Sequence, residues 1–185
     1  MDNYPYIIAG LPDLLLDHDS HPYNFKEIRQ QIVESCSAKD RRLIDWFEFG
    51  LQQEGLSPHF YREALKHNNL FIRSYFAYDK NLKMAKAAYV DKRPFSGEFE
   101  EYSRLKSVFT MTNIFEREKK LDDVTWDKIN EIVTYELFNI NVILAFLAKA
   151  HIVERWNALD QDRGKELFNR LVQEVKGTFK GVEYK

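Results

Sequence analysis

Apolar residues along the chain recur at steps of three and four positions, the spacing of one face of an α-helix. The clearest such run follows Pro58 and continues to Arg93 without a glycine or another proline, and Asn68–Asn69 can divide it into two helices. Similar patterns predict further helices on both sides. These helices are expected to begin at Asn24, to extend from Ser37 to a stop at Gly55, to cover Glu98–Thr110, to extend from Trp126 as far as Trp156, and to lie between Asp160 or Asp162 and Gly177.

Capping residues support several of these starts. Asn24 is followed three positions later by Glu27, which is the spacing of a capping box. Ser57 precedes Pro58, and proline suits the first turn of a helix. Ahead of Trp126, the charged segment 116–123 is predicted to be a connector. The cap of the helix that follows it is expected to be Thr125, Asp122 or Asp123.

The N-terminal segment has a different character from the rest of the chain. Tyr4–Pro12 is short, apolar and aromatic, which predicts a strand-like or irregular segment laid across a helical core, and Asp13–Tyr23 is predicted to be a loop. The strongest internal break is Pro94–Gly97. We therefore expect an N-terminal segment and first helical lobe over residues 1–94 and a second helical lobe over 95–185, with a single domain as the alternative.

The composition favours the same fold class. Glycine and proline are scarce, with 7 and 5 in 185 residues, whereas many short strands joined by tight turns need them. Their scarcity argues against a β-sandwich, a β-barrel and a glycine-rich phosphate loop. The sequence predicts an all-α multi-helix bundle, in one or two lobes, with a short extended N-terminal segment.

Charge and cysteine content exclude several classes of function. Up to Lys92 the chain has 12 basic and 13 acidic residues, and after it 15 and 16, so neither half has the basic surface expected for nucleic-acid binding. The most apolar stretch, Leu137–Ala148, is 12 residues long and too short to span a bilayer. The single cysteine, Cys36, cannot form an internal disulfide, and Met1–Tyr4 does not begin a signal peptide. These features favour a cytoplasmic protein.

One cluster of side chains could bind a metal. Carboxylates and imidazoles are ligands for Zn²⁺ or Mn²⁺, and five of them lie close together in the predicted N-terminal loop. Their spacing matches no helical two-histidine site, so a solvated acidic turn is the simpler interpretation, and a small metal-dependent enzyme is the alternative. The cluster consists of Asp13, Asp17, His18, Asp19 and His21.

Other candidate groups favour a structural role. Paired carboxylates at 100–101, 116–118 and 122–123 alternate with basic residues, as on a solvated helix face. His59, His67 and His151 are far apart in the sequence, and Cys36 has no histidine at a known motif spacing. We therefore expect no catalytic residue, no metal and no cofactor.

Two amides, Asn139 and Asn141, interrupt an apolar run that is predicted to be helical. Residues two apart on a helix point in nearly opposite directions, so at least one amide is expected to face the interior and to need hydrogen-bond partners. The favoured interpretation is an amide that fixes how helices pack, and a contact with a second protein is the alternative. Aromatic residues make up 15% of the chain, which suits core packing and partner surfaces.

Several motifs resemble a bacterial family of unknown function whose members are encoded beside subunits of a V-type (A/V-type) ATPase. They are Tyr6–Asp13 (YIIAGLPD), Ser37–Arg42 (SAKDRR) and Asn139–Phe146 (NINVILAF), the last followed by Arg155–Trp156. The helix around Asn141–Ile143 is also similar to the helices with Asn-Ile or Asn-Leu that recur in the lobes of the C-type subunit of that ATPase. The C-type subunit is an all-helical, funnel-like adaptor between the central shaft and the membrane ring.

The resemblance implies a non-catalytic adaptor of a rotary V-type ATPase. Its partners would be the central stalk and the membrane ring, with no nucleic acid and no direct insertion into the membrane. It would be held at the cytoplasmic face of the inner membrane through the ATPase. The chain is much shorter than the C-type adaptor and would supply fewer lobes. A metal-dependent enzyme using Asp13–His21 and a helical interaction module unrelated to ATPases are the alternatives.

Overall fold

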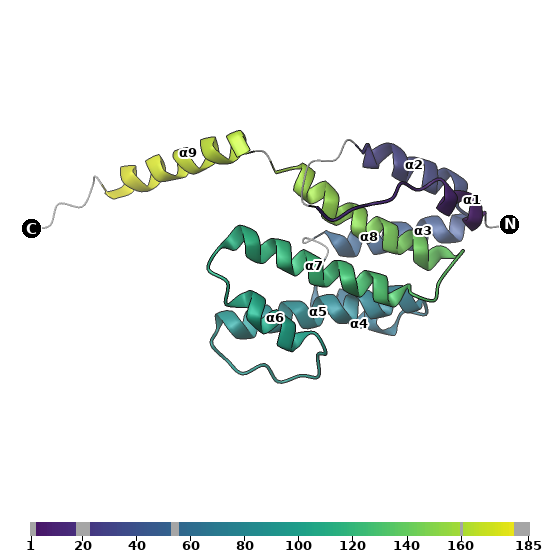
Figure 1. The fold of residues 1–185 in the computed structure, drawn as a ribbon, viewed down its shortest axis with the longest axis horizontal. Coiled ribbons are helices and arrows are strands. Elements are labelled where there is room, and N and C mark those ends of the chain that lie inside the picture. The colour runs from purple at the N-terminus through teal and green to yellow at the C-terminus, as the bar shows by residue number, and fades with distance from the viewer. Residues whose placement is uncertain (1–2, 18–22, 53–55, 160, 180–185) are drawn as a thin grey trace, which may run out of the picture.

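The chain folds into a helical body from which one helix projects (Figure 1). The computed structural model describes residues 3–17, 23–52, 56–159 and 161–179, and within these ranges it contains helices and no strand, which confirms the all-α prediction. The helices are α1 (Tyr4–Ala9), α2 (Phe25–Ser35), α3 (Ala38–Leu51), α4 (Pro58–Lys66), α5 (Leu70–Val90), α6 (Tyr102–Phe109), α7 (Ile114–Ile132), α8 (Ile140–Asn157) and α9 (Gln161–Phe179).

Helix α8 is the centre of the body. It packs against α1, α2, α3, α5 and α7, and Figure 1 shows it between the N-terminal helices and the α4–α7 group. A helix surrounded in this way must be apolar on most of its circumference. Its run Ile143–Ala148, the second half of the predicted apolar stretch, is buried without interruption.

The apolar interior forms two clusters. The larger cluster combines side chains of α1–α5 with Ile129 of α7 and the buried face of α8. The smaller cluster joins the second half of α5 to α6 and α7, around the fully buried Leu105. Helix α5 contributes to both clusters and connects them. The larger cluster draws on both sides of residue 94, and the division into two lobes there stays a prediction.

Local capping signals mark the starts of helices where the sequence placed them. The Ser57 side chain accepts a hydrogen bond from the amide of Phe60 at 3.1 Å, and Asn69 accepts one from the amide of Ile72 at 2.9 Å. Each satisfies a backbone donor that the first turn of a helix leaves unpaired. Asn24 and Ser37 cap α2 and α3 in the same manner.

The N-terminal segment differs from the prediction. Tyr4–Ala9 forms the short helix α1 rather than a strand-like or irregular segment. Pro5 lies in its first turn, where the ring fits the helical backbone and no amide hydrogen is required. Residues 12–16, which follow α1, have no regular secondary structure.

The middle of the chain also differs from the prediction. The predicted connector 116–123 lies within α7, and Asn113 caps that helix, so Thr125, Asp122 and Asp123 do not. Glu116 and Lys120 are exposed while Leu121 and Val124 are buried, which makes the segment an amphipathic helix.

Other helix ends also differ from the prediction. The predicted helix from Trp126 to Trp156 is divided by a turn at 133–139, so α7 ends at Ile132 and α8 begins at Ile140. Helix α9 continues past Gly177 to Phe179. Helix α3 ends at Leu51, and the predicted stop at Gly55 lies outside the described residues.

Candidate partner-binding surface

The predicted metal cluster is described only in part. Asp13 and Asp17 are exposed, and His18, Asp19 and His21 lie outside the described residues. The backbone carbonyl of Asp13 accepts a hydrogen bond from the Tyr23 hydroxyl at 3.2 Å. Within the ranges that the structure covers, no three histidine, cysteine or acidic side chains gather closely enough to hold a metal ion. The metal-dependent enzyme stays an untested alternative.

The paired carboxylates take part in ion pairs. Glu101 lies 2.8 Å from the ammonium of Lys128, and Glu118 lies 3.6 Å from that of Lys86. Asp122 is not on a solvated face, contrary to the sequence interpretation, because it is 6% exposed. Asp122 and Asp123 also lie beside basic side chains, those of Arg155 and Lys120, and such pairs favour a structural role for these four carboxylates.

Asn139 and Asn141 belong to a network that joins the starts of two helices. Asn139 lies outside the helix and caps α8, and the Asn141 amide donates a hydrogen bond to Glu136 at 3.0 Å. The Asn141 side-chain oxygen accepts a hydrogen bond from Asn69, the cap of α5, at 2.7 Å. The network therefore ties α8 to α5 through their first turns, and it includes no nucleophile or metal-ligating cluster.

The turn that leads to this network exposes apolar side chains. Tyr135 is 96% exposed, and Leu137 and Phe138 are 70% and 59% exposed. Leu70, the first residue of α5 and the neighbour of Asn69, is also exposed. An apolar group in water loses the free energy that burial would supply, so this end of the body offers a contact surface.

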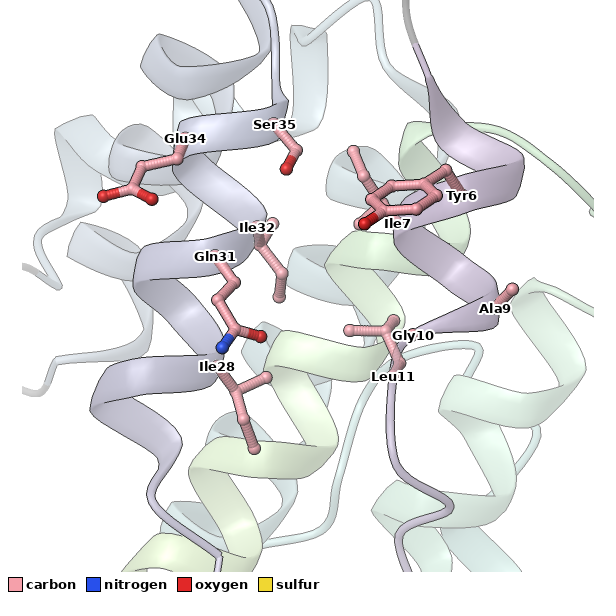
Figure 2. A pocket seen from close by; sticks show the side chains of 10 residues that line it. All are labelled: Tyr6, Ile7, Ala9, Gly10, Leu11, Ile28, Gln31, Ile32, Glu34 and Ser35. Carbon is pink, nitrogen blue, oxygen red and sulfur yellow. The ribbon is translucent and has the colours of Figure 1, made fainter.

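A shallow groove lies between α1 and α2. Figure 2 shows Tyr6 of α1 across from Ile32 and Ser35 of α2, with Leu11 nearer to Gln31 and Ile28. Its volume is about 430 Å³, and polar side chains of α2, including Ser35, line one rim. The groove lies beside the first motif of the family resemblance, Tyr6–Asp13, and offers a second open surface.

The most exposed apolar helix face belongs to α9. Leu167, Phe168, Leu171 and Val175 follow one side of the helix, and their side chains are 46–66% exposed. Charged and amide residues occupy the other side, so the helix is amphipathic. Figure 1 shows α9 extending away from the body. Its described apolar side chains belong to neither interior cluster.

Sequence reasoning identified α9 as a helix but missed its exposure. The three- and four-residue spacing of its apolar side chains is the same whether a helix packs into the core of its own chain or against another molecule. The sequence before α9 gives no signal that separates the two cases, because two of the three residues at 158–160 are apolar. Amphipathic helices of this kind bind into apolar grooves or pair with other helices. We therefore identify α9 as the candidate partner-binding surface.

Comparison with known proteins gives one relationship. A family model described as "Protein of unknown function (DUF2764)" matches residues 1–54 and 90–178, and the second range contains most of α9. No curated protein and no solved structure matches the chain significantly. Among the described residues, no helix is both long enough and apolar enough to cross a membrane. The match carries no link to a V-type ATPase, but it covers well over half of the sequence, and the chain therefore belongs to the DUF2764 family of proteins of unknown function.

Proposed function

We propose that this protein is a non-catalytic helical adaptor of a rotary V-type ATPase and that it binds its partner through α9. The observation that carries the proposal is the apolar face of α9, because its side chains lie in solvent although burial would stabilise them. A partner helix or groove that covers this face would remove the exposure.

The body supports the adaptor part of the proposal. Its interior is packed with aromatic rings, such as Phe47 with its ring centroid 5.6 Å from both Phe71 and Phe76. Close packing of this kind resists deformation, which a part that transmits force or fixes a distance requires. The ATPase part rests on the motif resemblance at Tyr6–Asp13, Ser37–Arg42 and Asn139–Phe146.

In this proposal the protein is the counterpart of the C-type adaptor and connects the central stalk to the membrane ring. Because α9 projects from one end of the body, it can reach a partner while the body contacts another part of the ATPase. The groove between α1 and α2 and the turn at 133–139 are the surfaces available for that second contact. The protein would be held peripherally at the cytoplasmic side of the inner membrane.

The test is co-purification from the native host with a tagged chain. The altered variant carries Phe168→Asp and Leu171→Asp, which place two negative charges on the apolar face of α9. The control carries Asn169→Asp and Gln173→Glu, which add the same charge on the opposite, polar face. We expect the wild-type and control proteins to recover ATPase subunits and the apolar-face variant to lose them.

Two results would contradict the proposal in different ways. Recovery of no ATPase component by the wild-type chain, in cells that express the catalytic subunits, would exclude the ATPase assignment. Equal recovery by the wild type and the apolar-face variant would exclude α9 as the binding surface. Far-UV circular dichroism of each variant checks that the helical body is intact.

A further inference from the structure

A second feature of the molecule is independent of α9. A cleft of about 250 Å³ lies between α5, α7 and α8, beside the end of α3. Leu51, Leu82 and Ile152 supply apolar surface, and tyrosines and charged side chains supply the rest. A small cavity with apolar walls and a few placed polar groups is the usual form of a ligand site.

Tyr75 is the group in this cleft that lacks a partner. Its side chain is only 9% exposed, and its ring is fixed by Phe47 and Phe71, whose centroids lie 5.4 and 5.9 Å away. The Tyr75 hydroxyl makes no hydrogen bond with any residue that the structure describes. Burial raises the pKa of Tyr75, so the hydroxyl keeps its proton and remains a donor.

Two neighbouring tyrosines have the hydrogen-bond partner that the Tyr75 hydroxyl lacks within the described residues. The Tyr78 hydroxyl lies 3.1 Å from the hydroxyl oxygen of Thr125, and the Tyr61 hydroxyl donates to Asp79 at 2.5 Å. The Tyr75 hydroxyl is not among the buried polar atoms that lack a partner, so solvent reaches it from the cleft. An acceptor that enters the cleft would replace water as the partner of this hydroxyl.

The charges of the cleft are already balanced. Lys83 lies 2.7 Å from Asp79, Lys86 pairs with Glu118, and the Arg155 guanidinium donates to Asp122 from a single nitrogen, Nη2. Burial and the charge of Arg155 lower the pKa of His151, so this ring is neutral at pH 7. An anionic or cationic ligand would lose its hydration without meeting an unpaired countercharge.

We propose that this cleft binds a small uncharged molecule whose carbonyl oxygen accepts a hydrogen bond from Tyr75 and whose apolar part lies against Leu51 and Leu82. The remaining N–H groups of Arg155 have no acceptor among the described residues, so the same oxygen has a second donor within the cleft. An amide or a ketone of about six carbons fits the volume and the chemistry.

The test is a titration of the full chain with hexanamide, followed by amide chemical shifts in ¹H–¹⁵N NMR spectra. Hexanoate, which has nearly the same shape and a negative charge, is the matched probe. We expect saturable shifts at the cleft-lining parts of α5, α7 and α8, with hexanoate binding at least about fivefold more weakly. Tyr75→Phe should weaken the binding of hexanamide by roughly 2- to 10-fold, which corresponds to the loss of one neutral hydrogen bond.

Tyr78→Phe is the control, because its hydroxyl lies in the same cleft but is already bonded to Thr125. We expect this control to bind hexanamide within about twofold of the wild type. Unchanged binding by Tyr75→Phe, absence of saturable shifts, or shifts confined to other surfaces would overturn the site. If hexanoate binds as tightly as hexanamide, the proposal that the cleft prefers an uncharged ligand is wrong. The ranking of the two probes uses wild-type protein, so it tests the proposal even if a variant does not fold.

Discussion

The Asp122 carboxylate accepts a hydrogen bond from the indole nitrogen of Trp156 at 2.7 Å, which joins the middle of α7 to the end of α8. The same carboxylate accepts a hydrogen bond from Arg155. Asp122→Ala would remove the acceptor of this buried indole donor, and we expect it to lower the free energy of unfolding by about 2–4 kcal/mol. Urea unfolding followed by circular dichroism measures this loss.

Asp127 provides the control for that experiment. It lies on the same helix and pairs with Arg104 at 2.7 Å, but both side chains are more than half exposed. Asp127→Ala should change stability by less than about 1 kcal/mol, as is usual for exposed ion pairs. Similar losses of unfolding free energy for the two variants would show that the buried Asp122–Trp156 hydrogen bond stabilises the fold no more than an exposed ion pair does.

The bridge between Asn69 and Asn141 gives a second prediction. Asn69 caps α5 through its side-chain oxygen and donates to Asn141 through its amide nitrogen, so Asn69→Ala removes two hydrogen bonds. We expect a loss of about 1–3 kcal/mol in the free energy of unfolding. Exposed Asn68, whose side chain makes no hydrogen bond within the described residues, should tolerate alanine with a change below about 0.5 kcal/mol.

A double-mutant cycle isolates the bridge itself. If the two amides interact directly, Asn69→Ala and Asn141→Ala should be non-additive by roughly 0.5–1.5 kcal/mol. Additive losses would mean that the two residues act only as separate local groups.

Two glycines provide a matched pair of substitutions. A side chain added at Gly50 would overlap the rings of Phe60 and Phe76, whereas one added at Gly164 in α9 would meet nothing within 4 Å. Gly50→Ala should destabilise the fold by about 1–3 kcal/mol through overpacking. Gly164→Ala should instead raise the helicity of α9, because alanine favours a helix over glycine by roughly 1 kcal/mol. Thermal unfolding and far-UV circular dichroism distinguish the two outcomes.

His67 makes the stability depend on pH. Burial lowers the pKa of His67, and its Nδ1 accepts a hydrogen bond from the amide of Asn69 at 3.0 Å, which requires the neutral ring. The unfolded chain then binds a proton more readily than the folded chain. Stability should therefore be greatest above the ordinary histidine pKa and should decrease as pH falls from about 7 toward 5.

The variant that tests this pH dependence is His67→Gln, measured by urea unfolding at a series of pH values. We expect a shallower decrease than in the wild type. Some decrease should remain, because the pKa of His151 is also lowered by burial. A pH profile parallel to that of the wild type would exclude a contribution from His67.

Helix α9 should contribute little to the stability of the body. Its described apolar side chains are absent from both interior clusters, so their removal exposes no core surface. A chain that ends at Leu159 should unfold within about 2 °C of the complete chain and should keep the amide dispersion of its body in NMR spectra. A large drop in melting temperature would mean that α9 packs onto the body in solution.

Much of the fold could be predicted from short-range signals. Ser57 with Pro58, and Asn69 after an interruption of the apolar pattern, define helix starts through contacts made within three residues. Such contacts depend on neighbouring residues alone, so the sequence contains all the information needed. Asn113 is a counterexample, because it caps α7 although the charged segment after it has the composition of a connector.

The features that sequence reasoning missed depend on distant residues. Asp122 has the spacing of an exposed acidic residue, and only its contact with Trp156, 34 positions away, explains its burial. Tyr75 has the spacing of a core aromatic residue, and its unbonded hydroxyl emerges only when α7 and α8 close the cleft. The exposure of α9 likewise depends on the direction in which the chain leaves α8. A periodicity identifies an apolar face but does not determine what covers it.

The central position of α8 has a consequence for the synthesis of the protein. Helices α1, α2 and α3 lie within the first 51 residues, yet each packs against α8, which begins at Ile140. At the usual rate of translation the ribosome needs on the order of 5–20 seconds to add the intervening residues. During that interval the early helices cannot complete their native packing, so their apolar faces stay without α8 until the last third of the chain has emerged.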